Sequence, residues 1–104
     1  MKEYKIVITA RAKTDMREVY AYISGNLKNP DAADSLLNKI ETEILTLTNM
    51  ASRHAFERDE QLKLKKIRKL IVDNYLVFYT VDENSETVFV VRILYARRDW
   101  INLL

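Results

Sequence analysis

The sequence predicts a small α+β domain in which one strand and two helices precede three further strands, in the order β-α-α-β-β-β. Three observations predict it: apolar strand-length runs fill the C-terminal third, two helical stripes precede them, and a short strand-forming run opens the chain. At 104 residues, with one glycine and one proline, the chain suits a single domain, 1–104, with one modest core.

The C-terminal strands are expected in three runs, 67–72, 76–81 and 88–94, which are rich in β-branched, aromatic and large aliphatic residues. Turn-forming residues separate them at 73–74 and at 82–86. Asn and Asp tolerate a positive φ and bond their own backbone, so both connections are predicted to be hairpins. The three strands should therefore form an antiparallel meander, covered by helices on one face and partly covered on the other.

The N-terminal run 4–9 is expected to be a strand that pairs with an edge of this meander. From Lys13 the apolar period becomes helical, which predicts a first helix capped by Thr14 or a slightly earlier residue, with Asp15 favourable in its first turn. Residues 24–26 can end it. Its stripe consists of Met16, Val19, Tyr20, Ile23 and Leu27.

A second helix is expected to begin at Asn29-Pro30, because Asn is a good N-cap and proline is tolerated at the first helical position. Its stripe consists of Ala33, Leu36, Leu37, Ile40, Ile44 and Leu47. Two amphipathic helices joined by a few residues form an antiparallel hairpin, whose apolar face must lie on the mainly antiparallel sheet. The segment 49–62 lacks a clean period and is predicted to be a loop, and the apolar ending 99–104 a docked last turn.

Composition excludes several classes of function. The absence of cysteine excludes disulfides, thiolate metal sites and cysteine nucleophiles, and the single histidine, His54, excludes paired-histidine metal ligation. We expect no metal and no cofactor. No apolar run approaches the roughly 20 residues that span a bilayer, and the N-terminus has no signal-peptide core, so a cytoplasmic protein without a membrane partner is expected.

Basic residues gather at the two ends of the meander, although the net charge is only +2. Lysines and arginines crowd 63–69, which indicates either an edge strand protected against aggregation or a nucleic-acid patch. Arg97-Arg98 follows the last strand and is either a solvated pair or part of a functional surface. Arg92, placed on the same face as Val90 and Leu94, is expected to extend to the sheet rim or to face a partner.

The aromatic residues at these ends suit either the core or a functional surface. Tyr75 and Tyr79 share a face and are expected to pack in or beside the core rather than to serve as stacking platforms. Tyr95 suits either packing or a polar role at the sheet end, and Trp100 is expected to cap the core.

Several segments, in this order and spacing, resemble the toxins of the RelE/ParE superfamily of bacterial type II toxin-antitoxin modules, the plasmid stabilisation type. These segments are 8–15, Tyr22-Ile23, 27–33, 68–79 and 91–100. The resemblance covers nearly the whole chain and implies the same α+β fold.

The superfamily has two main activities, poisoning of DNA gyrase in the ParE branch and ribosome-dependent mRNA cleavage in the RelE branch. The ribonuclease branch usually has an arginine where this chain has Leu76, and a Tyr or His near the C-terminus, where this chain has 101–104, Ile-Asn-Leu-Leu. The resemblance therefore favours gyrase and a protein that is not an enzyme, even though Tyr95 replaces a histidine common in the ParE branch. The expected target-binding residues are Arg92, Tyr95, Arg97, Arg98 and Trp100.

The alternative is an mRNA endoribonuclease acting on the ribosome. Its candidate catalytic residues are Arg68, Arg92, Tyr95, Arg97 and Arg98, since arginines can hold phosphates and a tyrosine can donate a proton. A third reading is a non-toxic module that only binds an antitoxin. All three imply a cognate antitoxin whose C-terminal segment covers apolar grooves and neutralises the arginines, giving a toxin-antitoxin hetero-oligomer.

Overall fold

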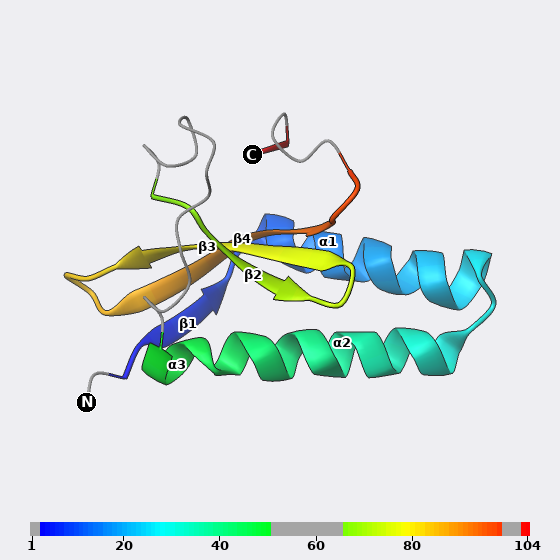
Figure 1. The fold of residues 1–104 in the computed structure, drawn as a ribbon, viewed down its shortest axis with the longest axis horizontal. Helices are drawn as coiled ribbons and strands as arrows, with labels where there is room; N and C mark the ends of the chain where they lie inside the picture. The colour runs from blue at the N-terminus through cyan, green and yellow to red at the C-terminus, as the bar shows by residue number, and fades with distance from the viewer. Residues whose placement is uncertain (1–2, 51–65, 99–102) are drawn as a thin grey trace.

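The computed structural model describes residues 3–50, 66–98 and 103–104, and the predicted order of elements is confirmed (Figure 1). The four strands form one mixed sheet in the order β1-β4-β3-β2, in which β1 runs parallel to β4 and the other pairs are antiparallel. The prediction that the N-terminal strand pairs with an edge of the meander is therefore confirmed. The strands are β1 (Lys5–Ile8), β2 (Arg68–Val72), β3 (Tyr75–Asp82) and β4 (Thr87–Tyr95).

The helices form the predicted antiparallel hairpin, which lies along one face of the sheet and extends past the turn between β2 and β3 (Figure 1). The helical elements are α1 (Ala10–Ala21), the π-helix η1 (Tyr22–Asn26), α2 (Pro30–Leu45) and the short α3 (Leu47–Met50). None of the helices among the described residues is both long and apolar enough to cross a membrane.

Helix α1 begins ahead of the predicted start at Lys13. Its cap was predicted at Thr14 or a slightly earlier residue, and the observed cap is Thr9. The Thr9 hydroxyl oxygen accepts a hydrogen bond from the Ala12 N–H at 3.2 Å and also donates to the Val90 carbonyl at 2.9 Å. One side chain thus caps the helix and ties it to β4. The second cap is as predicted, because Asn29 Oδ1 accepts from the Ala32 N–H at 3.1 Å and Pro30 takes the first helical position.

The first helix ends in a π-helical turn, which the sequence did not predict. Where residues 24–26 were predicted to end it, the backbone forms one turn of π-helix, and the Ser24 hydroxyl donates to the Tyr20 carbonyl at 2.7 Å. Lys28 then adopts a positive φ of 52° and turns the chain toward α2. Such π-helical turns are frequent at functional sites.

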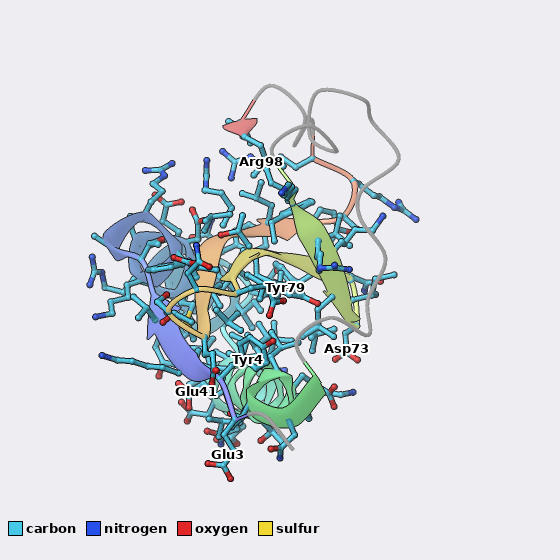
Figure 2. All side chains as sticks on the ribbon, turned by 90° about the vertical axis from the view of Figure 1, so that its left-hand side faces the viewer. Glu3, Tyr4, Glu41, Asp73, Tyr79 and Arg98 are labelled. Carbon is cyan, nitrogen blue, oxygen red and sulfur yellow. The ribbon has the colours of Figure 1, made fainter. Side chains whose placement is uncertain are left out.

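The main core lies between the sheet and the hairpin, with the fully buried Tyr79 near its centre (Figure 2). A smaller cluster covers the opposite face of the sheet, so the prediction of cover on both faces is confirmed. The main core consists of Ala12, Met16, Ile40, Ile44, Leu47, Leu70, Val72, Val77, Tyr79, Val88, Val90 and Ile93. The second cluster consists of Ile67, Leu76, Phe78 and Leu94, against which Val91, Leu103 and Leu104 pack.

A bulge in β4 corrects one prediction. Phe78 pairs with Arg92 and Tyr79 pairs with Val90, so Val91 is the extra residue. This insertion shifts the alternation by one position: Val90 packs in the main core, whereas Leu94 packs in the second cluster. The prediction that Arg92, Val90 and Leu94 share one face is therefore wrong.

The two hairpin turns follow the sequence prediction. Val72 pairs with Tyr75, which leaves the two-residue turn at 73–74, where Asp73 has a φ of 53°. In the second turn Asp82 Oδ1 accepts from the Asn84 N–H at 3.0 Å. Most of the predicted loop 49–62, with His54, and also Lys63, Lys65 and Trp100, lie outside the described residues.

Candidate functional site

A groove of about 720 Å³ lies between the far end of the helical hairpin and the end of the sheet where β3 begins and β4 ends. Its walls are mostly apolar. The helical wall consists of Val19, Tyr22, Ile23, Leu27, Ala32 and Leu36, and the sheet wall of Tyr75, Ile93, Leu94 and Tyr95. Four polar or charged side chains and one buried carboxylate complete the lining: Glu18, Asp73, Asn74, Arg98 and Asp15.

Exposed apolar side chains concentrate at this groove. Tyr22 is 52% exposed, Leu27 56% and Tyr95 41%, and all three line it. The other exposed large apolar residues among those described, Leu45 and Ile71, do not line it. Large apolar side chains clustered around a concave surface are typical of a protein-binding site.

Two tyrosines form the sheet end of the groove. The Tyr75 and Tyr95 rings pack edge to face, with their centroids 5.5 Å apart. Burial raises the pKa of Tyr75 above its ordinary value, and the neighbouring Tyr95 and Tyr22 raise it further. Tyr75 is therefore a neutral phenol at neutral pH and is poorly suited to accept a proton.

The turn that follows β4 holds Arg97 and Arg98 beside this groove. The Ala96 N–H donates to the Asn74 carbonyl at 2.8 Å, and the Arg98 N–H donates to the Tyr95 carbonyl at 3.0 Å. Both arginines are exposed, and Arg98 lines the groove. Figure 2 shows Arg98 on the opposite side of the molecule from the acidic residues Glu3 and Glu41.

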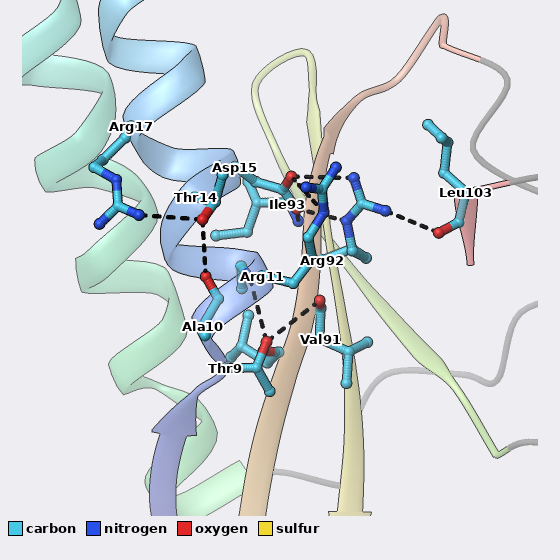
Figure 3. Close-up of polar contacts among 12 residues, drawn as sticks. Thr9, Ala10, Arg11, Thr14, Asp15, Arg17, Val91, Arg92, Ile93 and Leu103 are labelled. Carbon is cyan, nitrogen blue, oxygen red and sulfur yellow. Dashed lines mark hydrogen bonds and ion pairs between the residues drawn. The ribbon is translucent and has the colours of Figure 1, made fainter.

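Arg92 lies in a different environment, shown in Figure 3. It is 7% exposed and forms a two-pronged ion pair with the buried Asp15, with Nε to Oδ2 at 2.7 Å and Nη2 to Oδ1 at 3.1 Å. Its third contact is Nη1 to the Leu103 carbonyl at 2.8 Å. Arg92 thus joins α1, β4 and the residues at 103–104 instead of extending to the rim or facing outward.

Asp15 has a second role in this network. Strand β1 pairs with β4 only as far as Val90, and the Ile93 N–H beyond it donates to Asp15 Oδ2 at 3.0 Å. Asp15 was predicted only as a favourable residue of the first helical turn, but α1 begins at Ala10, so Asp15 lies in the second turn. The missed signal was its position, three residues after Ala12 and beside Met16 on the apolar stripe, where a buried acid needs a partner.

The structure brings only part of the predicted residue set together. One turn unites Tyr95, Arg97 and Arg98. Arg68 is half-buried at the other end of β2, about 13 Å along the strand from the hairpin turn at 3.3 Å per residue. No group of three or more potential metal ligands occurs among the residues that the structure describes.

The family model described as the ParE toxin of type II toxin-antitoxin system, parDE, matches residues 6–100. The chain belongs to the ParE toxin family. It is thus a ParE-type toxin of a type II toxin-antitoxin system. No curated protein sequence matches the chain.

Solved structures agree with this family at the level of the fold. The chromosomal ParDE toxin-antitoxin system from P. aeruginosa is similar with a TM-score of 0.75 and 18% identity, over 91% of this chain and 98% of that chain. The RelBE2 toxin-antitoxin complex from Mycobacterium tuberculosis has a TM-score of 0.62 and 18% identity, over 89% and 98% of the two chains. A mutant of the E. coli toxin RelE in the free state has a TM-score of 0.65 and 13% identity, over 97% and 92%.

Proposed function

We propose that this ParE-family toxin stops growth by poisoning DNA gyrase in the cytoplasm, and that the end of β4 is its target-binding surface. The observation that carries the proposal is the ParE family match over residues 6–100, which includes this surface. Tyr95, Arg97 and Arg98 are exposed there. Exposed arginines beside an aromatic ring suit a contact with an anionic surface such as a gyrase-DNA complex.

The geometry separates two of the five candidate residues of the mRNA cleavage alternative from Tyr95, Arg97 and Arg98, which share one turn. An mRNA endoribonuclease would need several of its candidate groups at one phosphate. Arg92 is instead held by Asp15, and Arg68 lies at the far end of its strand.

We further propose that the groove receives an apolar segment of a cognate antitoxin. Its walls are mostly apolar, and three of its large apolar side chains are exposed. The similar P. aeruginosa and M. tuberculosis structures are described as a toxin-antitoxin system and a toxin-antitoxin complex. An amphipathic segment laid into such a groove would bury these side chains and give a hetero-oligomer.

Expression without antitoxin tests the target. Growth arrest with cleaved DNA and a DNA-damage response supports gyrase, whereas cleaved mRNA with intact DNA supports the ribonuclease alternative. Absence of any growth effect supports the non-toxic binding module.

The target-binding surface is tested by the double variant Arg97→Ala with Arg98→Ala, which should abolish growth arrest because it removes both exposed charges. The matched control is Lys13→Ala with Arg17→Ala, which removes two exposed charges from α1 outside the groove. The control should stay toxic. If both double variants stay as toxic as wild type, Arg97 and Arg98 are not part of the target-binding surface.

The groove is tested by Leu27→Asp against Leu45→Asp. Both leucines are more than half exposed, 56% and 64%, so neither change disturbs the core, but only Leu27 lines the groove. We expect Leu27→Asp to weaken antitoxin binding at least tenfold and Leu45→Asp to leave it nearly unchanged, as measured by calorimetric titration. Equal affinities of the two variants would remove the groove from the interface.

A further inference from the structure

The two neighbouring arginines after β4 differ in their position relative to the groove. The Arg98 N–H closes a four-residue turn onto the Tyr95 carbonyl at 3.0 Å, which places Arg97 at a central, outer position of that turn and Arg98 at its end. Arg98 lines the groove, and Arg97 does not. The charge of Arg98 therefore lies at the groove, whereas that of Arg97 lies outside it.

Among the described residues that line the groove, Arg98 is the only one with a positively charged side chain. Asp15 is held by Arg92, and Asp73 pairs with Lys39 at 2.7 Å. Glu18 is an exposed acid on α1. Within residues 3–50, 66–98 and 103–104, no carboxylate forms an ion pair with Arg98.

An occupant of the groove must therefore accommodate a charged guanidinium beside apolar walls. Covering it with apolar groups alone would remove water from a charge without compensation, which is unfavourable. A carboxylate at this point of the occupant would instead form a charge-assisted hydrogen bond, with two prongs where the geometry permits.

We propose that the antitoxin segment in the groove carries an Asp or Glu side chain that pairs with Arg98, and that Arg97 stays outside this interface. The antitoxin thus discriminates between the two arginines, and Arg98 determines its specificity for this toxin. The inference rests on the proposed antitoxin partner and does not depend on whether gyrase is the target.

The test compares Arg98→Glu with Arg97→Glu. Both variants change the net charge equally, so they alter long-range attraction alike, and both positions are exposed, so both variants should fold. The probe is the purified protein encoded by the gene adjacent to the toxin gene, and its affinity is measured by calorimetric titration. We expect Arg98→Glu to weaken binding at least tenfold and Arg97→Glu less than threefold.

A second measurement follows Arg98→Ala over a series of salt concentrations. The difference in affinity between wild type and Arg98→Ala should shrink as salt rises, because screening weakens an exposed ion pair. Arg97→Ala should differ little from wild type at every salt concentration. Unchanged melting curves of the free variants show that the folds are intact, and Arg98→Gln replaces any variant that does not fold.

Equal losses for the two positions, or a larger loss for Arg97, would overturn the inference, as would a salt-independent effect at Arg98. Failure of the proposed function looks different: wild type would then not bind the adjacent gene product at all. A clear preference for Arg98 supports the inference even where expression of the toxin leaves gyrase unaffected.

Discussion

At the scale of single residues, the pair of Asp15 and Arg92 shows how a charge in a strand is tolerated inside this fold. Removing two charges from water costs several kcal/mol each, and the cost is offset only with excellent geometry and further hydrogen bonds. Both conditions are met, because Asp15 accepts from Arg92 and from the Ile93 N–H, while Arg92 also bonds the Leu103 carbonyl. The pair joins the first helix to the last strand.

Arg92→Met should destabilise the fold by about 3–5 kcal/mol, because it leaves the buried Asp15 carboxylate with only the exposed Arg11, whose Nε lies 3.9 Å from Oδ1. Adding Asp15→Asn should recover part of that loss, since the amide oxygen still accepts from the Ile93 N–H and no charge remains buried. Urea denaturation of both variants measures this. A double variant less stable than Arg92→Met alone would contradict this account of the pair.

Tyr75 supplies a prediction about pH. Folding raises its pKa above the ordinary value of 10.0, so the folded protein holds this proton more tightly than the unfolded chain. Its effect on stability is therefore absent below pH 10.0, and stability falls as the pH rises through that value toward the raised pKa.

The measurement is the difference in unfolding free energy between wild type and Tyr75→Phe across alkaline pH. Tyr4 and Lys39 also have raised pKa values, through hydrogen bonds to Glu83 and Asp73, but they contribute equally to both proteins. We expect wild type to lose stability relative to Tyr75→Phe in this range. Parallel curves would show that Tyr75 is not desolvated by the groove.

At the scale of secondary-structure elements, N-cap residues fix where each helix of the hairpin begins. Thr9 and Asn29 each accept a hydrogen bond from a backbone N–H in the first helical turn. The sequence predicted the second cap at its residue, but placed the first only at Thr14 or a slightly earlier residue. The difference is physical: Asn29-Pro30 is a local signal, whereas Thr9 also bonds the Val90 carbonyl, far along the chain.

Asn29→Ala should cost about 1 kcal/mol of stability, because it removes the acceptor for the Ala32 N–H. The control is Asn38→Ala, the same change at an exposed position within α2, which should stay within about 0.5 kcal/mol of wild type. Thermal or urea denaturation of the two variants separates the cap from a general effect of alanine in a helix. Equal stabilities would show that the cap contributes nothing.

At the scale of the whole molecule, the groove exists because the hairpin extends past the sheet (Figure 1). The π-helical turn carries Tyr22 and Ile23 over the sheet end, where Tyr75 and Tyr95 complete the wall. None of these elements forms the groove alone. Binding at this surface should therefore stabilise the domain as a unit.

A partner that binds only the folded toxin should raise its unfolding free energy by about 2.7 kcal/mol when its free concentration is one hundred times its Kd. For a domain of this size, each kcal/mol corresponds to a rise in melting temperature of about 4–8 °C. Thermal melting with excess antitoxin measures this. The rise should be much smaller for Leu27→Asp at the same antitoxin concentration and unchanged for Leu45→Asp.

The sequence by itself determined the order of elements, the two-residue turn at 73–74 and the start of α2, because local periodicity, turn residues and caps act within a few residues of one another. It also pointed to Tyr95, Arg97 and Arg98 as neighbours at one end of the last strand. Only the tertiary structure decided that Arg92 is buried against Asp15, 77 positions away, and that a bulge at Val91 shifts β4. These features depend on how distant segments pack against each other. The same is true of the groove, which Arg98 lines and Arg97 does not.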